Sequence, residues 1–338
     1  MSQPVVTIIS LGGTIASVPD ETGLAGPRLS AAELASAIPR LGELAHVEVR
    51  DVARLPSCDV SFRLAREVAA EIADAVERGS DGIVVTQGTD TIEEMSFCLD
   101  LLVGVDTPLA VVGAMRHPGL PGSDGAANLL DAVRTVISPD AVGLGCLVVM
   151  NEQIHSARAV RKLHTSSPSA FNSGEVGPLG WIAEGTAHLR DRPYPRITLS
   201  VPEDVEVPLP PLIRMTMDDD GWWLAAIREM NPPGLVIEAM GGGHVPGWLS
   251  GEVLEIAQRV PVVLTSRTGG GEVLTHTYGG FPGSETTLVS GGVIPGGTLD
   301  GLKARVLLAL LLAAGTQRPD IHRTMSDMGT LDRSATRG

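Results

Sequence analysis

Short apolar runs alternate with longer segments of helical periodicity through most of this chain of 338 residues. Residues 5–10 are rich in β-branched side chains, and two glycines follow at once. Residues 63–78 place their apolar side chains at helical spacing, and the buried-strand run GIVVT comes next, at residues 82–86. Strand, helix and strand in this cadence predict a parallel sheet with helices on both faces.

The same alternation defines two regions on either side of a proline-rich segment, residues 191–211, which has no helical period and is expected to be a linker. The domains would then be residues 1–190 and 212–338. The tail from residue 316 is polar and is expected to dock loosely. The other expected strands are residues 109–112, 145–150, 213–217, 235–238 and 262–265, and the other expected helices are residues 91–102, 126–137, 248–258 and 299–314.

This pattern predicts an α/β protein of two domains. The larger N-terminal domain would be flavodoxin-like, with a mostly parallel sheet flanked by helices. The smaller C-terminal domain would be a Rossmann-like α/β domain.

The composition excludes several kinds of partner. Lys and Arg number 25 against 40 Asp and Glu, a formal charge of −15, which argues against a nucleic-acid or membrane partner. The cysteines, Cys58, Cys98 and Cys146, are odd in number and widely spaced, which suits a reducing compartment. The chain starts without a signal-peptide pattern, and its apolar runs are too short to span a membrane. We therefore expect a cytoplasmic location.

The loops that follow the strands are the places to search for a site, because ligands of doubly wound sheets bind there. After the first strand, Gly12 and Gly13 permit unusual backbone angles and leave the Thr14 hydroxyl at the mouth of the cleft. The alternative is a plain turn in which Thr14 caps the next element. A phosphate loop is unsupported, because no Gly-Lys-Ser/Thr follows.

A second loop, QGTDTIEE from residue 87, carries Thr89 and Asp90 directly after a strand. Asp90 could be an ordinary helix N-cap. If the two strands are neighbours, however, the loops together gather two hydroxyls, a carboxylate and several backbone N–H groups. Such a group could hold an amino acid, the carboxylate binding its ammonium and the N–H groups its carboxylate.

The two loops together resemble the signatures of the bacterial-type asparaginase family. The segment LGGTIA from residue 11 is similar to the family's TGGTIA, and QGTDTIEE from residue 87 is similar to its HGTDT(M/L/I)EE. The resemblance spans roughly residues 5–315. Supporting segments match in the same order: VGAMR at residues 112–116, Ser-Asp-Gly with a later Asn at 123–128, VVMN at 148–151, FNSGEVGPLG at 171–180 and KARVLLAL at 303–310.

The resemblance implies hydrolysis of L-asparagine to L-aspartate and ammonia through a threonine acyl-enzyme, with no cofactor and no metal. Thr14 would be the nucleophile, and Thr89, Lys162 and Asp90 would form the proton relay. The alternative for Lys162, from the residues alone, is a solvated surface charge. The substrate would be held by Gly13, Ser57, Cys58, Gly88, Thr89, Asp90 and the backbone carbonyl of Ala114.

The chain departs from the family pattern at several positions. The family places a tyrosine in the loop after Thr14, and residues 17–30 contain none. Tyr278 or Glu285, supplied by a neighbouring subunit, could take over part of that role, although their glycine-rich segment could equally be a plain interface loop. His244 stands near the position where the family often has an asparagine that reaches the partner's site. Smaller departures are Leu11, Cys58 and Gln87, the last replacing the usual histidine.

Other functions stay open. The enzyme could act on a related amide, such as D-asparagine, glutamine or a modified metabolite. It could also be an amino-acid-binding descendant with little turnover, although a binder has no need of the relay. The resemblance further implies a homo-oligomer, either a dimer or a tetramer of intimate dimers. A Ser-His-Asp hydrolase lacks its Gly-x-Ser-x-Gly motif, and the eight histidines form no metal motif.

Overall fold

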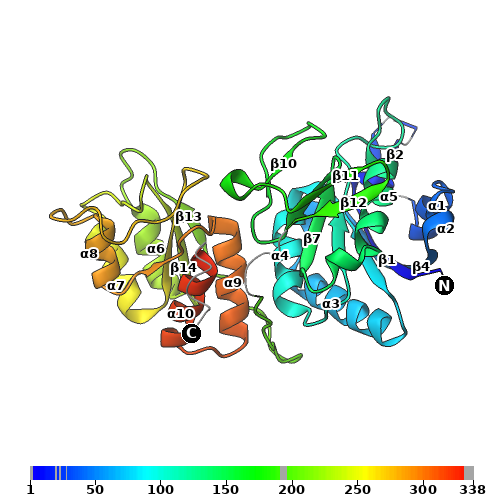
Figure 1. Ribbon diagram of the computed structural model, residues 1–338. Helices are drawn as coiled ribbons and strands as arrows, with labels where there is room; N and C mark the ends of the chain where they lie inside the picture. Colours follow the sequence, from blue (N-terminus) through cyan, green and yellow to red (C-terminus); the bar gives the residue numbers. More distant parts are fainter. Residues whose placement is uncertain (1–2, 20, 23, 28, 191–195, 331–338) are drawn as a thin grey trace. The chain divides into compact units, whose positions relative to one another are not determined.

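The computed structural model describes residues 3–190, except 20, 23 and 28, and residues 196–330. The chain forms two compact units, Met1–Thr198 and Leu199–Gly338 (Figure 1). The boundary between them falls inside the expected linker of residues 191–211, of which residues 191–195 lie outside the described part.

The N-terminal unit is built on a sheet that runs, within the described residues, in the order β12-β11-β8-β7-β6-β5-β1-β4. The strands from β4 to β7 are parallel, which confirms the predicted α/β architecture. The strands are β1 (Val5–Gly12), β4 (His46–Leu55), β5 (Gly82–Thr86), β6 (Leu109–Val112), β7 (Cys146–Met150), β8 (Gln153–Ser156), β11 (Gly180–Ala183) and β12 (Thr186–Leu189).

Helices cover both faces of this sheet. Helix α5 (Gly125–Val136) packs on β5, β6 and β7, and α3 (Phe62–Glu77) and α4 (Ile92–Leu102) pack together on the other face (Figure 1). The sequence predicts the bounds of all three to within one residue, because their apolar stripes are regular. Two short helices, α1 (Ala31–Ser36) and α2 (Leu41–Leu44), precede β4.

The far side of the sheet is antiparallel, which the alternation of strands and helices did not predict. Strands β7 and β8 form a tight hairpin whose two loop residues, Asn151 and Glu152, have φ values of 52° and 61°. A two-residue turn of this kind needs left-handed backbone at both positions and needs no helix. Strands β11 and β12 then continue the sheet as a second hairpin.

Strand β8 carries a buried histidine, His155, which makes stability depend on pH. Its Nδ1 lies 2.9 Å from Ser173 Oγ, and its Nε2 has no partner among the described residues. Burial lowers the pKa of His155 from 6.5 to about 4. The folded protein therefore binds fewer protons than the unfolded chain between these pH values, and acid favours unfolding.

We expect the free energy of unfolding to fall below pH 6.5, by about 3 kcal/mol in total by pH 4 from His155 alone. The measurement is urea unfolding at several pH values for the wild type and for His155→Gln. The difference between the two proteins isolates His155 from the carboxyl groups. Parallel pH dependences for the two proteins would contradict the expectation.

The C-terminal unit has a parallel sheet in the order β13-β14-β15-β16. Its buried core includes Leu235, Ile237, Val262 and Leu264 from the two central strands. This confirms the predicted smaller α/β domain. The elements are β13 (Leu212–Arg214), α6 (Trp222–Met230), β14 (Leu235–Ala239), α7 (Ser250–Arg259), β15 (Val262–Ser266), α8 (Glu285–Ser290), β16 (Ile294–Pro295), α9 (Gly301–Ala313) and α10 (Arg318–Gly329).

The expectation of a loosely docked tail is wrong for residues 316–330. Helix α10 packs on α9 and β16 and buries Ile321, Met325 and Met328. These three side chains recur at helical spacing and form a narrow apolar stripe, which the polar composition of the segment hides. Residues 331–338 of the expected tail lie outside the described part.

Among the described helices, none has the length and apolar character needed to cross a membrane.

Candidate active site

Three loops meet at the carboxyl ends of β4, β1 and β5, because these strands are neighbours in the sheet. Strand β1 pairs directly with β5, so the loops that carry Thr14 and Thr89 lie side by side. Gly13 has a φ of 82°, and a Cβ atom there would overlap the backbone of Gly88. Only glycine permits both this angle and this close approach.

Thr14 begins the short 3₁₀ helix η1 (Thr14–Ala16) and is half-buried. The carbonyl of Gly13 accepts hydrogen bonds from Ala16 N, at 3.1 Å, and from Ser17 Oγ, at 2.8 Å. The Thr14 hydroxyl makes no hydrogen bond to another described residue. A ribbon of two short strands follows, β2 (Ser17–Pro19) and β3 (Ala25–Pro27). The backbone is therefore held at Thr14, while its hydroxyl stays available.

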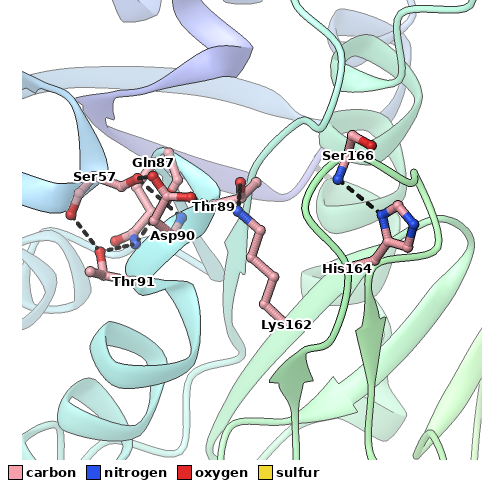
Figure 2. A network of polar contacts seen from close by, with 9 residues as sticks. Ser57, Gln87, Thr89, Asp90, Thr91, Lys162, His164 and Ser166 are labelled. Atoms are coloured by element: carbon pink, nitrogen blue, oxygen red, sulfur yellow. Dashed lines mark hydrogen bonds and ion pairs between the residues drawn. The ribbon is translucent and has the colours of Figure 1, made fainter. Parts of the chain in front are cut away.

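Lys162 brings the second loop into a polar network (Figure 2). It lies on β9 (Arg161–Lys162), which pairs with β10 (Phe171–Asn172). Its Nζ donates to Thr89 Oγ1, at 2.9 Å, and to Asp90 Oδ1, at 2.6 Å. The Lys162 side chain is only 14% exposed, so a solvated surface lysine does not describe it. The hydrogen bond from Lys162 is the main reason that the pKa of Asp90 lies below its usual range.

Ser57 holds Asp90 from the opposite side (Figure 2). It lies in the 3₁₀ helix η2 (Ser57–Asp59), which follows β4. Its hydroxyl donates to Asp90 Oδ2, at 3.1 Å, and accepts a hydrogen bond from Asp90 N, at 3.0 Å. The Thr91 hydroxyl donates to the carbonyl of Ser57, at 2.8 Å. The Asp90 side chain is nevertheless 64% exposed, which leaves it open to a ligand.

Comparison with known proteins shows the family to which the chain belongs. Residues 5–195 match the family model "Asparaginase, N-terminal", and residues 211–325 match the model "Glutaminase/Asparaginase C-terminal domain". The chain belongs to the asparaginase family. It is therefore an amidohydrolase, as the sequence motifs predicted.

Individual relatives cover nearly all of the chain. The L-asparaginase of Bacillus licheniformis is 37% identical over 91% of this chain and 95% of its own length. A probable L-asparaginase of Deinococcus radiodurans is 37% identical over 96% of this chain and 98% of its own length. The crystal structure of a probable cytoplasmic L-asparaginase from Campylobacter jejuni superposes with a TM-score of 0.86, at 28% identity, over 96% and 99% of the two chains.

Two positions at which this asparaginase-family chain departs from the usual motifs lie beside the network. Gln87 is buried, and its Nε2 donates to the Gly88 carbonyl, at 3.3 Å, and to Thr91 Oγ1, at 3.4 Å. Gln87 thus ties the start of the loop to its end. Cys58 is exposed next to Ser57, and its Sγ is 3.8 Å from Asp59 Oδ1. Among the described residues, the Cys58 side chain makes no hydrogen bond to Ser57, Asp90 or Lys162.

Ala114 follows β6 and is fully buried. Its carbonyl accepts no hydrogen bond from a described residue. The loop that carries it abuts the second motif, because a Cβ atom on Gly113 would lie 2.8 Å from the Gln87 carbonyl oxygen and 3.0 Å from Thr89 Cγ2. The expected substrate-contact residues of the N-terminal unit therefore come from four adjoining loops.

His244, Tyr278 and Glu285 form a separate cluster in the C-terminal unit. Glu285 begins α8 and is fully buried, with Oε2 3.0 Å from His244 Nε2 and Oε1 accepting from Tyr278 N at 2.5 Å. Burial raises the pKa of Glu285, but these hydrogen bonds outweigh it and the pKa lies below its usual value. The Tyr278 ring packs edge-on against His244, with 5.0 Å between ring centroids. A buried carboxylate that orients a histidine is an arrangement suited to proton transfer.

Proposed function

We propose that this protein hydrolyses the side-chain amide of L-asparagine to L-aspartate and ammonia. The observation that supports it most strongly is the Lys162 contact with both Thr89 and Asp90, beside the loop of Thr14. This set offers two hydroxyls, a carboxylate and an amine within one small region. The names of the relatives from Bacillus licheniformis and Deinococcus radiodurans agree with the proposal.

In the proposed reaction, the Thr14 oxygen attacks the carbon of the substrate's side-chain amide. The C–N bond breaks, the nitrogen takes a proton and leaves as ammonia, and an ester to Thr14 remains. Water then attacks the ester, and aspartate is released with the proton returned to Thr14. Splitting the reaction into two steps helps because an amide is a poor electrophile.

A hydroxyl is a weak nucleophile unless a base accepts its proton. Thr89, Lys162 and Asp90 form the proposed route for that proton, since Lys162 Nζ is within hydrogen-bond distance of the other two side chains. Asp90 fixes the position of Lys162, and its depressed pKa keeps it ionised through mildly acidic pH.

The substrate contacts in this proposal follow from the same loops. Asp90, with Ser57 and the neighbouring Cys58, would bind the substrate's ammonium side. The Ala114 carbonyl would accept a hydrogen bond from the amide. Backbone N–H groups in the loops of Gly13 and Gly88 would face the oxyanion that forms during attack.

The test is ammonia release by the purified protein from L-asparagine, D-asparagine and L-glutamine. We expect L-asparagine to give the largest kcat/KM. Faster release from D-asparagine or L-glutamine would move the function to a related amide. A folded protein that binds L-asparagine without turnover would support the amino-acid-binding alternative and contradict the proposal.

The homo-oligomer and the cytoplasmic location are parts of the same proposal; the Campylobacter jejuni relative carries the description cytoplasmic. In the proposed oligomer, the site of a neighbouring subunit is completed by His244, Tyr278 and Glu285. These side chains would take over part of the role of the missing tyrosine. Glu285 would orient His244, and His244 would act near Thr14 of the other copy.

Combining two impaired variants in one oligomer tests this contribution. We expect His244→Ala to lower kcat by about a hundredfold, the lower end of the range for loss of a proton-transfer group. Co-expression of His244→Ala with Thr14→Ala should restore activity, because one mixed site then has both Thr14 and His244. The control is the same two variants purified separately and assayed together without subunit exchange. No recovery in the co-expressed protein would show that His244 does not act across subunits.

A further inference from the structure

Hydrogen bonds hold the backbone on both sides of Ala114. The carboxylate of Asp124 accepts from Met115 N, at 3.1 and 3.0 Å, and from Arg116 N, at 2.8 Å. The side chain of Asn128 donates from Nδ2 to the carbonyl oxygen of Gly113, at 3.0 Å. Ala114 therefore lies between two anchored peptide groups.

The bond to Met115 N sets the direction of the Ala114 carbonyl. A peptide group is planar and trans, so its N–H and C=O point in opposite directions. The Met115 N–H and the Ala114 carbonyl belong to one peptide group. Because Asp124 holds this N–H, the carbonyl of Ala114 must point away from Asp124.

The Ala114 carbonyl is buried and accepts no hydrogen bond from a described residue, whereas nearly all buried carbonyls in proteins are paired. Its loop lies against the loop of Thr89, as the contacts around Gly113 show. A ligand N–H group is the partner that would satisfy this oxygen.

Asn128 makes the anchor rigid by joining three elements. It is only 2% exposed and lies on α5. Besides its bond to Gly113, Nδ2 donates to Asp124 Oδ2, at 3.1 Å, and Oδ1 accepts from Asn151 N, at 3.0 Å, in the turn after β7. The ends of β6 and β7 are thus tied to the first turn of α5. A side-chain amide with both ends bonded in a buried place resists rotation.

From this geometry we infer that Asp124 and Asn128 are positioning residues, which aim the Ala114 carbonyl at the N–H groups of the leaving amide. The inference rests on the proposed function, because it assigns a partner to the amide nitrogen of that reaction. Neither residue touches the substrate. Both act through the backbone of residues 113–116.

The test compares two substrates that differ only at the leaving group: L-asparagine and the β-methyl ester of L-aspartate. The ester has no N–H to donate to the Ala114 carbonyl, yet it needs the same nucleophile. We expect Asp124→Asn and Asn128→Asp each to lower the amide-to-ester ratio of kcat/KM about tenfold, the size of one ordinary hydrogen bond. The ester value alone should stay within about threefold of wild type.

Asp100→Asn is the matched control, because Asp100 is a carboxylate that accepts a backbone N–H, from Cys146 at 2.8 Å, at the amino end of β7. It should leave the ratio unchanged. Equal losses on amide and ester in the positioning variants, or the same ratio change in Asp100→Asn, would overturn the inference while the proposed function stands. If Asp124→Asn does not fold, Asn128→Asp decides by the same ratio. A wild-type protein that hydrolyses neither substrate would instead overturn the proposed function, and this inference with it.

Discussion

Replacement of Thr14 by alanine is expected to reduce ammonia release from L-asparagine by at least about 10³-fold, as is usual when a covalent nucleophile is removed. Thr14 is half-buried, and its hydroxyl has no hydrogen bond to another described residue, so its loss leaves no buried partner unpaired. The fold should therefore survive the change. The measurement is kcat by ammonia release, with thermal unfolding of both proteins.

Thr14→Ser is the control for this prediction. Serine keeps the hydroxyl and loses only the methyl group, so it should retain much more activity than alanine. A Thr14→Ala protein with near wild-type turnover would remove Thr14 from the mechanism. Loss of turnover in Thr14→Ser equal to that in Thr14→Ala would indicate that the side chain acts by packing.

Replacement of Lys162 by methionine is expected to lower kcat by about 10²- to 10⁴-fold, the range for loss of a positioned proton-transfer group. Methionine has nearly the same length, so the packing of the aliphatic stem is preserved. Two hydrogen bonds are lost, to Thr89 at 2.9 Å and to Asp90 at 2.6 Å. The pKa of Asp90 should rise toward its ordinary value, because the bond from Lys162 is the main cause of its depression.

Arg161→Met is the control for Lys162, since it removes a cation from the adjacent residue of the same strand, β9. Successive side chains of a strand point to opposite faces, so Arg161 does not share the position of Lys162. We expect its kcat to stay close to wild type. Equal losses in the two variants would mean that general positive charge, and not the Lys162 contact, supports activity.

Elements with regular apolar periodicity could be predicted from the sequence. Helices α3, α4 and α5 and the parallel strands β1, β5, β6 and β7 fall where the 3.6-residue and short-run patterns put them. The parallel strand β4 was not among the expected strands, and its side chains are mostly half-buried or exposed. The second hairpin, β11 to β12, was not predicted, because its short strands mix buried and exposed residues, whereas β6 is buried throughout. Helix α10 was missed because its three buried side chains are spaced through a polar segment.

The residues of the candidate site also differ in whether the sequence alone could predict them. Thr14, Thr89 and Asp90 follow strands directly, so the rule that ligands bind at the carboxyl ends of strands makes them candidates without any relative. The family resemblance was needed to prefer a catalytic role over a plain turn at Thr14 and a helix N-cap at Asp90. Lys162 lies 72 residues from Asp90 along the chain and on a strand of two residues. From the residues alone it had no distinguishing signal, and only the family resemblance selected it. Asp124 and Asn128 appeared only as a matching segment, with no role.

The sequence by itself determined the two-domain α/β class, the family and the residues that follow the first and third long strands, because these depend on local periodicity and on contiguous motifs. Only the tertiary structure decided which side chains meet. The contacts of Lys162, Ser57, Asp124 and Asn128 join segments from different strands and helices, and these distances are set by the order of strands in the sheet. Strand order depends on the packing of the whole domain, which no short stretch of sequence encodes.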